Sequence, residues 1–446
     1  MSVDLGDLCA AALRVAKDGE HVEAFVQESR RTEVRARAGD VESVKFSESR
    51  GVGVRLVHAG RLGYAWAADP SVAEVGATVA RARENAALAT EDEHNVLPTP
   101  EHPEALPGLF HQELVDTPTA RKVELALGLD VAAARSDPRV RKVDHVSYSD
   151  SITRIAIAST RGVRGEYGRT DCWCSASTLA EEGDETQTGF AFRLARDPGG
   201  LDWMACAEEA ARRAGRLLGA RKPESGPFRV VLDPAAAVAF LGVLAGALSA
   251  ESVQKGRSLF ASLSGEVVAS STVNLVDDGR LLDGPGASPV DDEGVPTKRT
   301  PLIDRGRLSG FLHNTHTAHR GQTISTGNAG RAGFRSPPGV SSSNLFLKAG
   351  TRSPEDLLRQ VDHGVYIQEV SGVHSGANAI TGEFSVGATG LRITGGELGE
   401  PLREMTVAST LRQVLERVVA VGSDLRFFGS TGSPTVSVEE MTIGGT

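Results

Sequence analysis

Three histidines recur at three-residue intervals in the second half of the chain, at His313, His316 and His319. Imidazole is the commonest metal ligand in proteins, and residues three apart share one face of a helix. No Asp, Glu or Cys stands at ligand spacing beside them, although a zinc site normally has three or four protein ligands. We therefore expect a solvated or cleft-lining cluster, and weak metal binding at these histidines stays open.

The sequence patterns of several enzyme classes are missing. No Gly-x-Ser-x-Gly elbow lies between an expected strand and helix, so a serine hydrolase has no position for its nucleophile. No Gly-x-x-x-x-Gly-Lys-Ser/Thr loop or strand-linked Gly-x-Gly-x-x-Gly occurs, so no nucleotide site is indicated. The carboxylate pairs Asp291 with Asp292 and Glu439 with Glu440 lie on loops or strand ends, where we expect them to be solvated. No catalytic residue is therefore predicted.

The four cysteines predict free thiols in a reducing compartment. Cys172 and Cys174 would face the same side of a strand, but no second pair stands at zinc-ribbon spacing. We expect ordinary, half-buried thiols and no metal there. The N-terminal segment lacks the basic and apolar regions of a signal peptide, so we expect a cytoplasmic protein.

Composition excludes two broad classes of partner. The net charge of −10 over 446 residues repels phosphate, so no nucleic-acid partner is expected. No apolar run approaches the ~20 residues that span a membrane, so no membrane partner is expected either. The 50 glycines, with aromatic residues at only 5%, indicate many tight turns in a β-rich protein.

The elements that must position any site alternate between helical and strand periods. Apolar residues at helical spacing predict the first-half helices, while period-two alternation with short Gly- and Asp-rich turns predicts an antiparallel meander. The expected helices cover residues 5–16, 71–88, 119–134 and 203–218, and the expected strands cover 21–27, 34–38, 51–57, 61–67, 142–149, 153–159, 172–180 and 185–194.

The second half repeats this mixture after a Pro- and Gly-rich stretch at residues 219–227. The expected strands cover 228–232, 365–370, 384–388, 390–394 and 435–441, with a hairpin at 302–312 and helices at 235–250 and 409–420. We predict an α+β fold with antiparallel sheets and packed helices. Its two domains would be an N-terminal α+β domain over 1–220 and a C-terminal α+β domain over 227–446.

Three blocks of the second half together resemble the TldD/PmbA family, once called modulators of DNA gyrase. They are Thr-His-Thr-Ala-His at 315–319 with Ser-Thr-Gly-Asn-Ala-Gly-Arg at 325–331, the Gly-rich segment 372–385, and Glu-Met-Thr-Val-Ala-Ser at 404–409 with Val-Gly-Ser-Asp-Leu at 421–425. Their order and spacing match throughout. The segments 51–56 and 62–67 extend the resemblance into the first half, so it covers nearly the whole chain.

The resemblance implies which branch of the family this is. TldD-like chains carry a HExxxH zinc motif on the helix after the first strand of the C-terminal domain, where two imidazoles hold the metal and the glutamate acts on its water. Here the corresponding positions are Gly242, Val243 and Ala247, and no His or Glu occurs between Asp233 and Ala250. The chain resembles the PmbA/TldE branch, which implies no cofactor in this chain and zinc in a TldD-like partner.

The same resemblance implies a non-catalytic subunit of a metallopeptidase heterodimer that processes or degrades small unfolded peptides. The segments 325–331 and 372–384 would line its chamber. The predicted substrate-binding residues are Asn328, His374, Ser375, Asn378 and Thr381, although turn geometry is the plainer role of the glycines beside them. Two alternatives stay open: a free-standing hydrolase that uses the histidine cluster, and a homodimeric peptide-binding protein.

Overall fold

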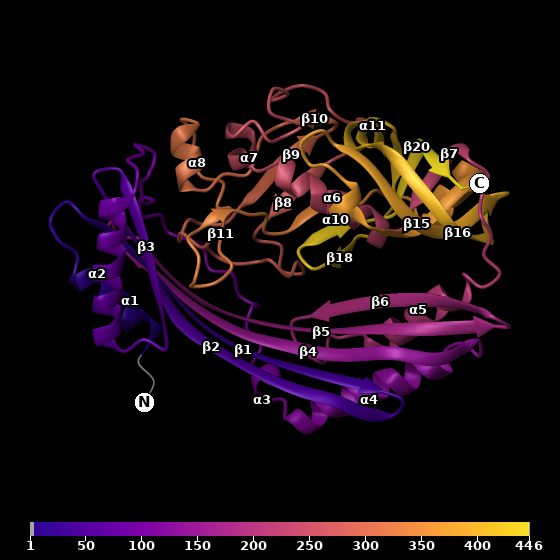
Figure 1. Ribbon diagram of the computed structural model, residues 1–446, viewed down its shortest axis with the longest axis horizontal. Helices are drawn as coiled ribbons and strands as arrows, with labels where there is room; N and C mark the ends of the chain where they lie inside the picture. The colour runs from indigo at the N-terminus through magenta and orange to yellow at the C-terminus, as the bar shows by residue number, and fades with distance from the viewer. Residues whose placement is uncertain (1–3, 446) are drawn as a thin grey trace.

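Residues 4–445 are described by a computed structural model, and they form a long curved sheet beneath a second, more compact group of sheets (Figure 1). The helices are α1 Leu5–Arg14, α2 Val72–Leu88, α3 Gln112–Asp116, α4 Thr119–Arg135, α5 Trp203–Gly215, α6 Pro234–Ala247, α7 Ala250–Gln254, α8 Thr315–Arg320, α9 Pro354–Val361, α10 Val373–Gly376 and α11 Leu411–Glu416. The α+β fold class is thereby confirmed.

The strands alternate with these helices along the chain. They are β1 His21–Arg37, β2 Asp40–His58, β3 Arg61–Ala68, β4 Val140–Ser159, β5 Arg164–Glu182, β6 Glu185–Ala195, β7 Gly226–Leu232, β8 Leu275–Asp278, β9 Arg299–Asp304, β10 Arg307–Leu308, β11 Ala329–Gly330, β12 Gly339–Val340, β13 Leu345–Leu347, β14 His363–Ser371, β15 Glu383–Thr394, β16 Glu397–Thr410, β17 Val418–Val421, β18 Arg426–Phe428, β19 Thr431–Ser433 and β20 Val436–Gly444.

The first six strands make one antiparallel sheet in the order β3-β2-β1-β4-β5-β6. Side chains alternate between its two faces. Val22, Ala24 and Val26 of β1 pack under α1 and α2, and farther along the same strand Val34 and Ala36 pack under α4. The opposite face carries Phe25, Ile155 and Ile157, which contact the loops of the second half. The helices therefore cover one face, and the C-terminal half lies over the other.

The second half contains a closed β-barrel. Strands β16-β15-β14-β7-β20 are neighbours in one sheet, and β16 also pairs with β20, which joins the two ends into a ring of five. A smaller sheet in the order β10-β9-β8-β13-β19-β18 lies beside it. The apolar helix α6 packs Phe240, Leu241 and Leu244 into the core between them.

Most of the predicted elements are confirmed, and the differences have physical reasons. The 71–88 helix begins after Ser71, whose hydroxyl accepts a hydrogen bond from Glu74 N at 3.2 Å. The break expected between the strands 21–27 and 34–38 is wrong, because β1 is continuous through it. A turn is present at residues 38–39, and from there β2 pairs with β1 along its whole length. The helix expected at 409–420 is also wrong in extent: it is the short α11 between β16 and β17.

Cys172 and Cys174 do face one side of β5, but they are fully buried rather than half-buried, at 0% and 1% exposed, because α4 and α5 cover them.

The long sheet uses residues 21–195 and the other sheets use 226–444. The domain division at 219–227 stays a prediction. No helix within residues 4–445 is long and apolar enough to cross a membrane.

Candidate functional site

The helix that the resemblance matches to the HExxxH zinc helix is α6. Asp233 caps it by accepting a hydrogen bond from Ala235 N at 3.0 Å. Gly242 is exposed and Val243 is half-buried, but Ala247 is fully buried in the core. Five residues of helix turn the chain by about 140°, whereas four bring it back to nearly the same face. The exposed residue one turn beyond Gly242 is therefore Gly246.

The exposed face of α6 offers no side-chain ligand for a metal. A Cβ placed at Gly242 or at Gly246 would meet no atom within 4 Å, so the surface there is open but has no side chain. Zinc requires nitrogen, sulfur or carboxylate ligands, and glycine, valine and alanine provide none. Within residues 4–445, no three or more His, Cys, Asp or Glu side chains are arranged to hold a metal ion.

A polar cleft lies between the curved sheet and the loops of the second half. Its volume is about 540 Å³. One wall comes from strands β1, β4 and β5, and the other from the loops around residues 286–292, 327–333 and 341–343. The wall residues that are polar or glycine are Gln27, Thr153, Tyr167, Arg169, Gly286, Ser288, Asp291, Asp292, Thr297, Gly327, Asn328, Gly330, Arg331, Gly333, Ser341, Ser342, Ser343 and Ser430. Such a lining offers hydrogen-bonding groups suited to an extended polar chain.

Four buried charges connect the two walls. Arg55 of β2 donates to Glu23 of β1 and to Glu293 of the second half, both at 2.5 Å. Arg331, from the Ser325–Arg331 block, also pairs with Glu23. Burial acts to lower the pKa of Arg55, but Glu23 and Glu293 outweigh it and raise that pKa. The guanidinium therefore stays charged, and it joins segments 238 residues apart in the chain.

Asn328 lies in the cleft, but its polar atoms are already used. Its side-chain amide donates to Asp277 at 2.6 Å and to Ser341 O at 3.1 Å, and its oxygen accepts from Thr326 at 2.6 Å. Burial raises the pKa of Asp277 to about 6, although the hydrogen bond from Asn328 acts to lower it. Asn328 thus shapes the wall of the cleft through its neighbours.

The expectation that the carboxylate pair Asp291 and Asp292 is solvated is wrong for Asp291. Asp291 is buried rather than solvated, and its carboxylate accepts hydrogen bonds from Glu293 N, Val295 N and Ala329 N, each at 2.9 Å. Burial, reinforced by Glu293, raises the pKa of Asp291. Two of these backbone donors lie within four residues of Asp291, and the third comes from Ala329 of β11, which the local sequence does not predict. The other pair, Glu439 and Glu440, is exposed as expected.

The other four predicted binding residues lie in a different place. His374 and Ser375 are exposed on α10, and Asn378 Oδ1 accepts from Ile380 N and Thr381 N at 2.8 and 3.2 Å. Asn378 therefore closes a turn within its own loop, as Asn commonly does. None of these four lines the polar cleft, so the structure does not bring them together with Asn328.

The three histidines have different hydrogen-bonding surroundings, although the His94 ring packs against both His316 and His319. His316 Nε2 lies 3.0 Å from Asp92 Oδ2, and His319 Nδ1 lies 3.1 Å from His94 Nδ1. Burial lowers the pKa of the half-buried His313, whose Nδ1 has no hydrogen-bond partner. Asp92 and His94 belong to the loop after α2, so this cluster is a contact between the two halves of the chain.

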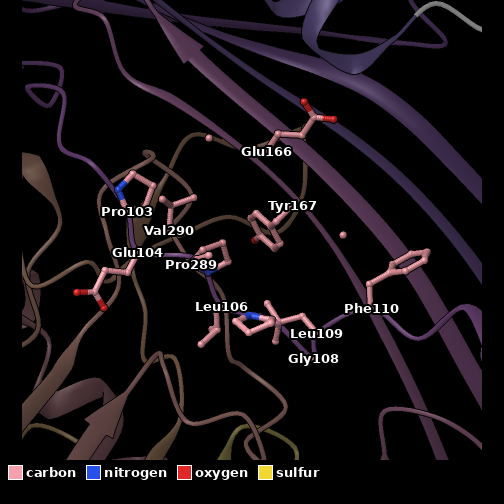
Figure 2. Close-up of a pocket in the computed structure, with 14 residues that line it drawn as sticks. Pro103, Glu104, Leu106, Gly108, Leu109, Phe110, Glu166, Tyr167, Pro289 and Val290 are labelled. Atoms are coloured by element: carbon pink, nitrogen blue, oxygen red, sulfur yellow. The ribbon is translucent and has the colours of Figure 1, made fainter.

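An apolar hollow of about 510 Å³ adjoins the polar cleft (Figure 2). The segment 103–110 and the pair Pro289 and Val290 line it against Gly165–Gly168 of β5, and Tyr167 belongs to both cavities. Glycine at position 168 leaves room for the Phe110 ring, because a Cβ there would lie 2.9 Å from the ring. Sequence reasoning missed Tyr167 and the Glu23–Arg55–Glu293 charges, since only long-range packing assembles them.

The domain models of one family match residues 22–86, 113–218 and 225–445, as domain 1, the central domain and the C-terminal domain of PmbA/TldA metallopeptidases. The chain belongs to the PmbA/TldD family of metalloproteases.

Three of its relatives match almost the whole chain. The metalloprotease PmbA of Escherichia coli O157:H7 is 26% identical, over 99% of this chain and 96% of that protein. A Thermotoga maritima crystal structure, described as a candidate modulator of a DNA gyrase, is 27% identical with a TM-score of 0.92 and covers 99% of this chain and 100% of its own. TldE from Thermococcus kodakarensis, at 22% identity, a TM-score of 0.90 and 99% coverage of both chains, shares the fold.

Proposed function

We propose that this chain is the zinc-free, substrate-shaping subunit of a TldD/TldE-type metallopeptidase that processes or degrades small unfolded peptides in the cytoplasm. The observation that supports this most is the exposed face of α6, where Gly242, Val243 and Gly246 stand. A HExxxH helix supplies two imidazoles and a carboxylate, and none of these groups is present. A TldD-like subunit would hold the zinc.

The cleft supports the second part of the proposal. An extended peptide presents a backbone N–H and C=O at every residue and binds best where many polar groups are within reach. Gln27, Arg169 and Ser342 provide side-chain groups, and the glycine-rich segment 327–333 lets a chain approach closely. The adjoining hollow around Tyr167 has room for an apolar side chain. A folded protein would not enter a cavity of this size.

The test of the non-catalytic role compares three preparations: this chain alone, a TldD-like subunit alone, and the two mixed. Metal content is measured by inductively coupled plasma mass spectrometry, and cleavage of an unfolded peptide by mass spectrometry. We expect no stoichiometric metal and no cleavage from this chain alone, and chelator-sensitive cleavage from the mixture. Tightly held zinc with peptide cleavage by the lone chain would refute the proposal and support the hydrolase built on the histidine cluster.

The test of substrate shaping narrows the cleft. Ser342→Arg would fill part of it with a long side chain, so the KM of the mixed enzyme for an unfolded peptide should rise several-fold while its zinc content stays unchanged. Ser262→Arg, an exposed position outside the cleft, is the matched control and should leave KM unchanged. Equal KM values for the two variants would contradict peptide binding in the cleft, and the proposal that this chain lacks zinc would still stand.

A further inference from the structure

Arg169 lines the polar cleft with a guanidinium that is only partly paired. It lies on β5 and shares one face of that strand with Tyr167, because strand side chains alternate between faces. Its side chain is 30% exposed, and its Nε lies 3.0 Å from Asp171 Oδ2 without the alignment of a hydrogen bond. Within residues 4–445, neither Nη1 nor Nη2 of Arg169 takes part in a hydrogen bond. Both groups are therefore available to a ligand in the cleft.

The acidic neighbours of Arg169 are occupied by other groups. Asp171 Oδ1 accepts a hydrogen bond from Arg196 Nη1 at 2.5 Å, so two guanidiniums share this one carboxylate. Asp292 also lines the cleft, and its Oδ2 accepts from Arg331 N at 2.7 Å. Burial raises the pKa of Asp292, although the charges of Arg331 and Arg169 act to lower it. This part of the cleft therefore favours an added carboxylate.

An apolar hollow begins beside this charge. Tyr167 and Arg169 are two residues apart on one face of β5, about 7 Å along the strand, and Tyr167 lines both cavities. The apolar residues of the hollow are Leu106, Leu109, Pro289 and Val290 (Figure 2). Of the two glutamates at its border, Glu104 lies 3.6 Å from Arg280, and the carboxylate of Glu166 points away from the hollow (Figure 2). Neither excludes an apolar side chain.

We propose that Arg169 binds the C-terminal carboxylate of the peptide, while the apolar side chain of the same last residue enters the hollow beside Tyr167. A guanidinium binds a carboxylate through two parallel hydrogen bonds, and Nη1 and Nη2 can donate them. Only the last residue of a peptide carries its free main-chain carboxylate and a side chain on one carbon atom. The inference rests on the proposed peptide substrate and names its class: short peptides with a free C-terminus and a final apolar residue.

The first test measures binding to the full chain alone by isothermal titration calorimetry. Two N-acetylated peptides of the same sequence end in leucine, one with a free carboxylate and the other with an amide. The amide lacks the charge, so its dissociation constant should be about tenfold or more higher. A third peptide ends in serine with a free carboxylate. It leaves the hollow empty and should bind several-fold more weakly than the leucine peptide.

Variants of the arginine identify the group that reads the carboxylate. Arg169→Gln should raise the dissociation constant of the free-carboxylate peptide about tenfold and leave that of the amide unchanged. Arg169→Lys keeps the charge but not the two parallel donors, so it should restore part of the preference. Arg164→Gln is the matched control. Arg164 is exposed on the opposite face of β5 and lines neither cavity, so the preference should remain. Circular dichroism checks that each variant is folded.

Several outcomes would overturn the inference. If wild type binds the free carboxylate and the amide equally well, Arg169 does not read the C-terminus, and peptide binding in the cleft still stands. A folded Arg169→Gln that keeps the preference leads to the same conclusion. Tighter binding of an amidated peptide with an internal glutamate would assign Arg169 to an acidic side chain instead.

The inference and the proposed function can fail separately. A wild-type chain that binds none of the peptides would refute both the carboxylate site and peptide binding in the cleft, while the zinc-free role is judged from metal content. A clear preference for the free carboxylate, with no cleavage by the mixture with a TldD-like subunit, would support the role of Arg169 and refute the peptidase role.

Discussion

The two ends of the long sheet are built from the same strands and are stabilised in opposite ways. At one end, Arg55 of β2 is buried among Glu23, Glu293 and the C-terminal loops. At the other end of β2, Phe46 is 63% exposed and the strand edge is open. At the Arg55 end, called the closed end, the buried charges have their partners within the chain. At the Phe46 end, called the open end, the backbone N–H and C=O groups of the strand edge can bond to another strand. The Arg55 end of β2 is therefore joined to the second half of the chain, whereas the outer edge of β2 at Phe46 is open to another strand.

The largest expected effect comes from removing the central charge of the closed end. Arg55→Ala leaves Glu23 and Glu293 buried with one counter-charge fewer, and breaking such a pair costs about 3–5 kcal/mol. Urea unfolding followed by circular dichroism measures the loss. Arg30→Ala on the open arm is the control: its side chain is 58% exposed beside Glu28 and Glu48, so we expect a change within about 0.5 kcal/mol. Equal losses for the two variants would contradict the contrast.

A second test uses pH at the β6 border of the sheet, where Glu209 pairs with Arg193 at 2.6 Å and with Arg426 of the second half at 2.9 Å. Burial acts to raise the pKa of Glu209, but the Arg426 and Arg193 guanidiniums outweigh it and lower that pKa to about 2. Because the folded state holds the charged form, this stability is present above the ordinary pKa of 4.5 and is lost as pH falls from 4.5 toward 2.

Glu209→Gln should therefore reduce the free energy of unfolding by about 3 kcal/mol at pH 7. The gap between wild type and variant should shrink steadily below about pH 4.5, as measured by urea unfolding at several pH values. A gap that stays constant from pH 7 to pH 3 would show that Glu209 does not hold the two halves together through its charge.

A third, smaller effect concerns the packing of the closed end. A Cβ at Gly63 of β3 would overlap Ala82 O and Ala86 N of α2, so Gly63→Ala should cost about 1–3 kcal/mol as the helix is pushed outward. Gly76→Ala is the control. Gly76 lies on α2, where a Cβ meets nothing within 4 Å, so the free energy of unfolding should rise by about 0.5–1 kcal/mol. Thermal unfolding of both variants compares them, and a destabilised Gly76→Ala would argue against this packing.

The smallest expected effect belongs to the open arm. Phe46→Ser exposes no new core, because the ring is already largely in solvent, so the free energy of unfolding of the monomeric chain should change by less than about 0.5 kcal/mol. Unfolding is measured at protein concentrations low enough to keep the chain monomeric. A loss above about 2 kcal/mol would place the ring in a core of the single chain and remove the contrast between the ends.

Local patterns predicted the elements better than their extents. The α2 helix, its Ser71 cap and the hairpin at 302–312 follow from nearest-neighbour periodicity and turn chemistry. The continuous pairing of β1 with β2 does not follow from local patterns. Residues 28–33 of β1 are held in a strand by pairing with β2 on one side and β4 on the other, and both partners are distant or not locally apparent in the sequence. Of the five predicted binding residues, Asn328 reached the cleft, whereas Asn378 folds back on its own loop.

The sequence by itself determined what α6 cannot do. Ligand chemistry is a property of side-chain types, and Gly242, Val243 and Gly246 have no donor atoms in any fold. Only the tertiary structure decided that Asp291 is buried, that Arg55 meets Glu293, and that β2 keeps a free edge. Those outcomes depend on contacts between residues tens to hundreds of positions apart. Whether a charged side chain is buried or a strand edge is paired depends on which distant segments pack against it, and a local sequence pattern does not specify those segments.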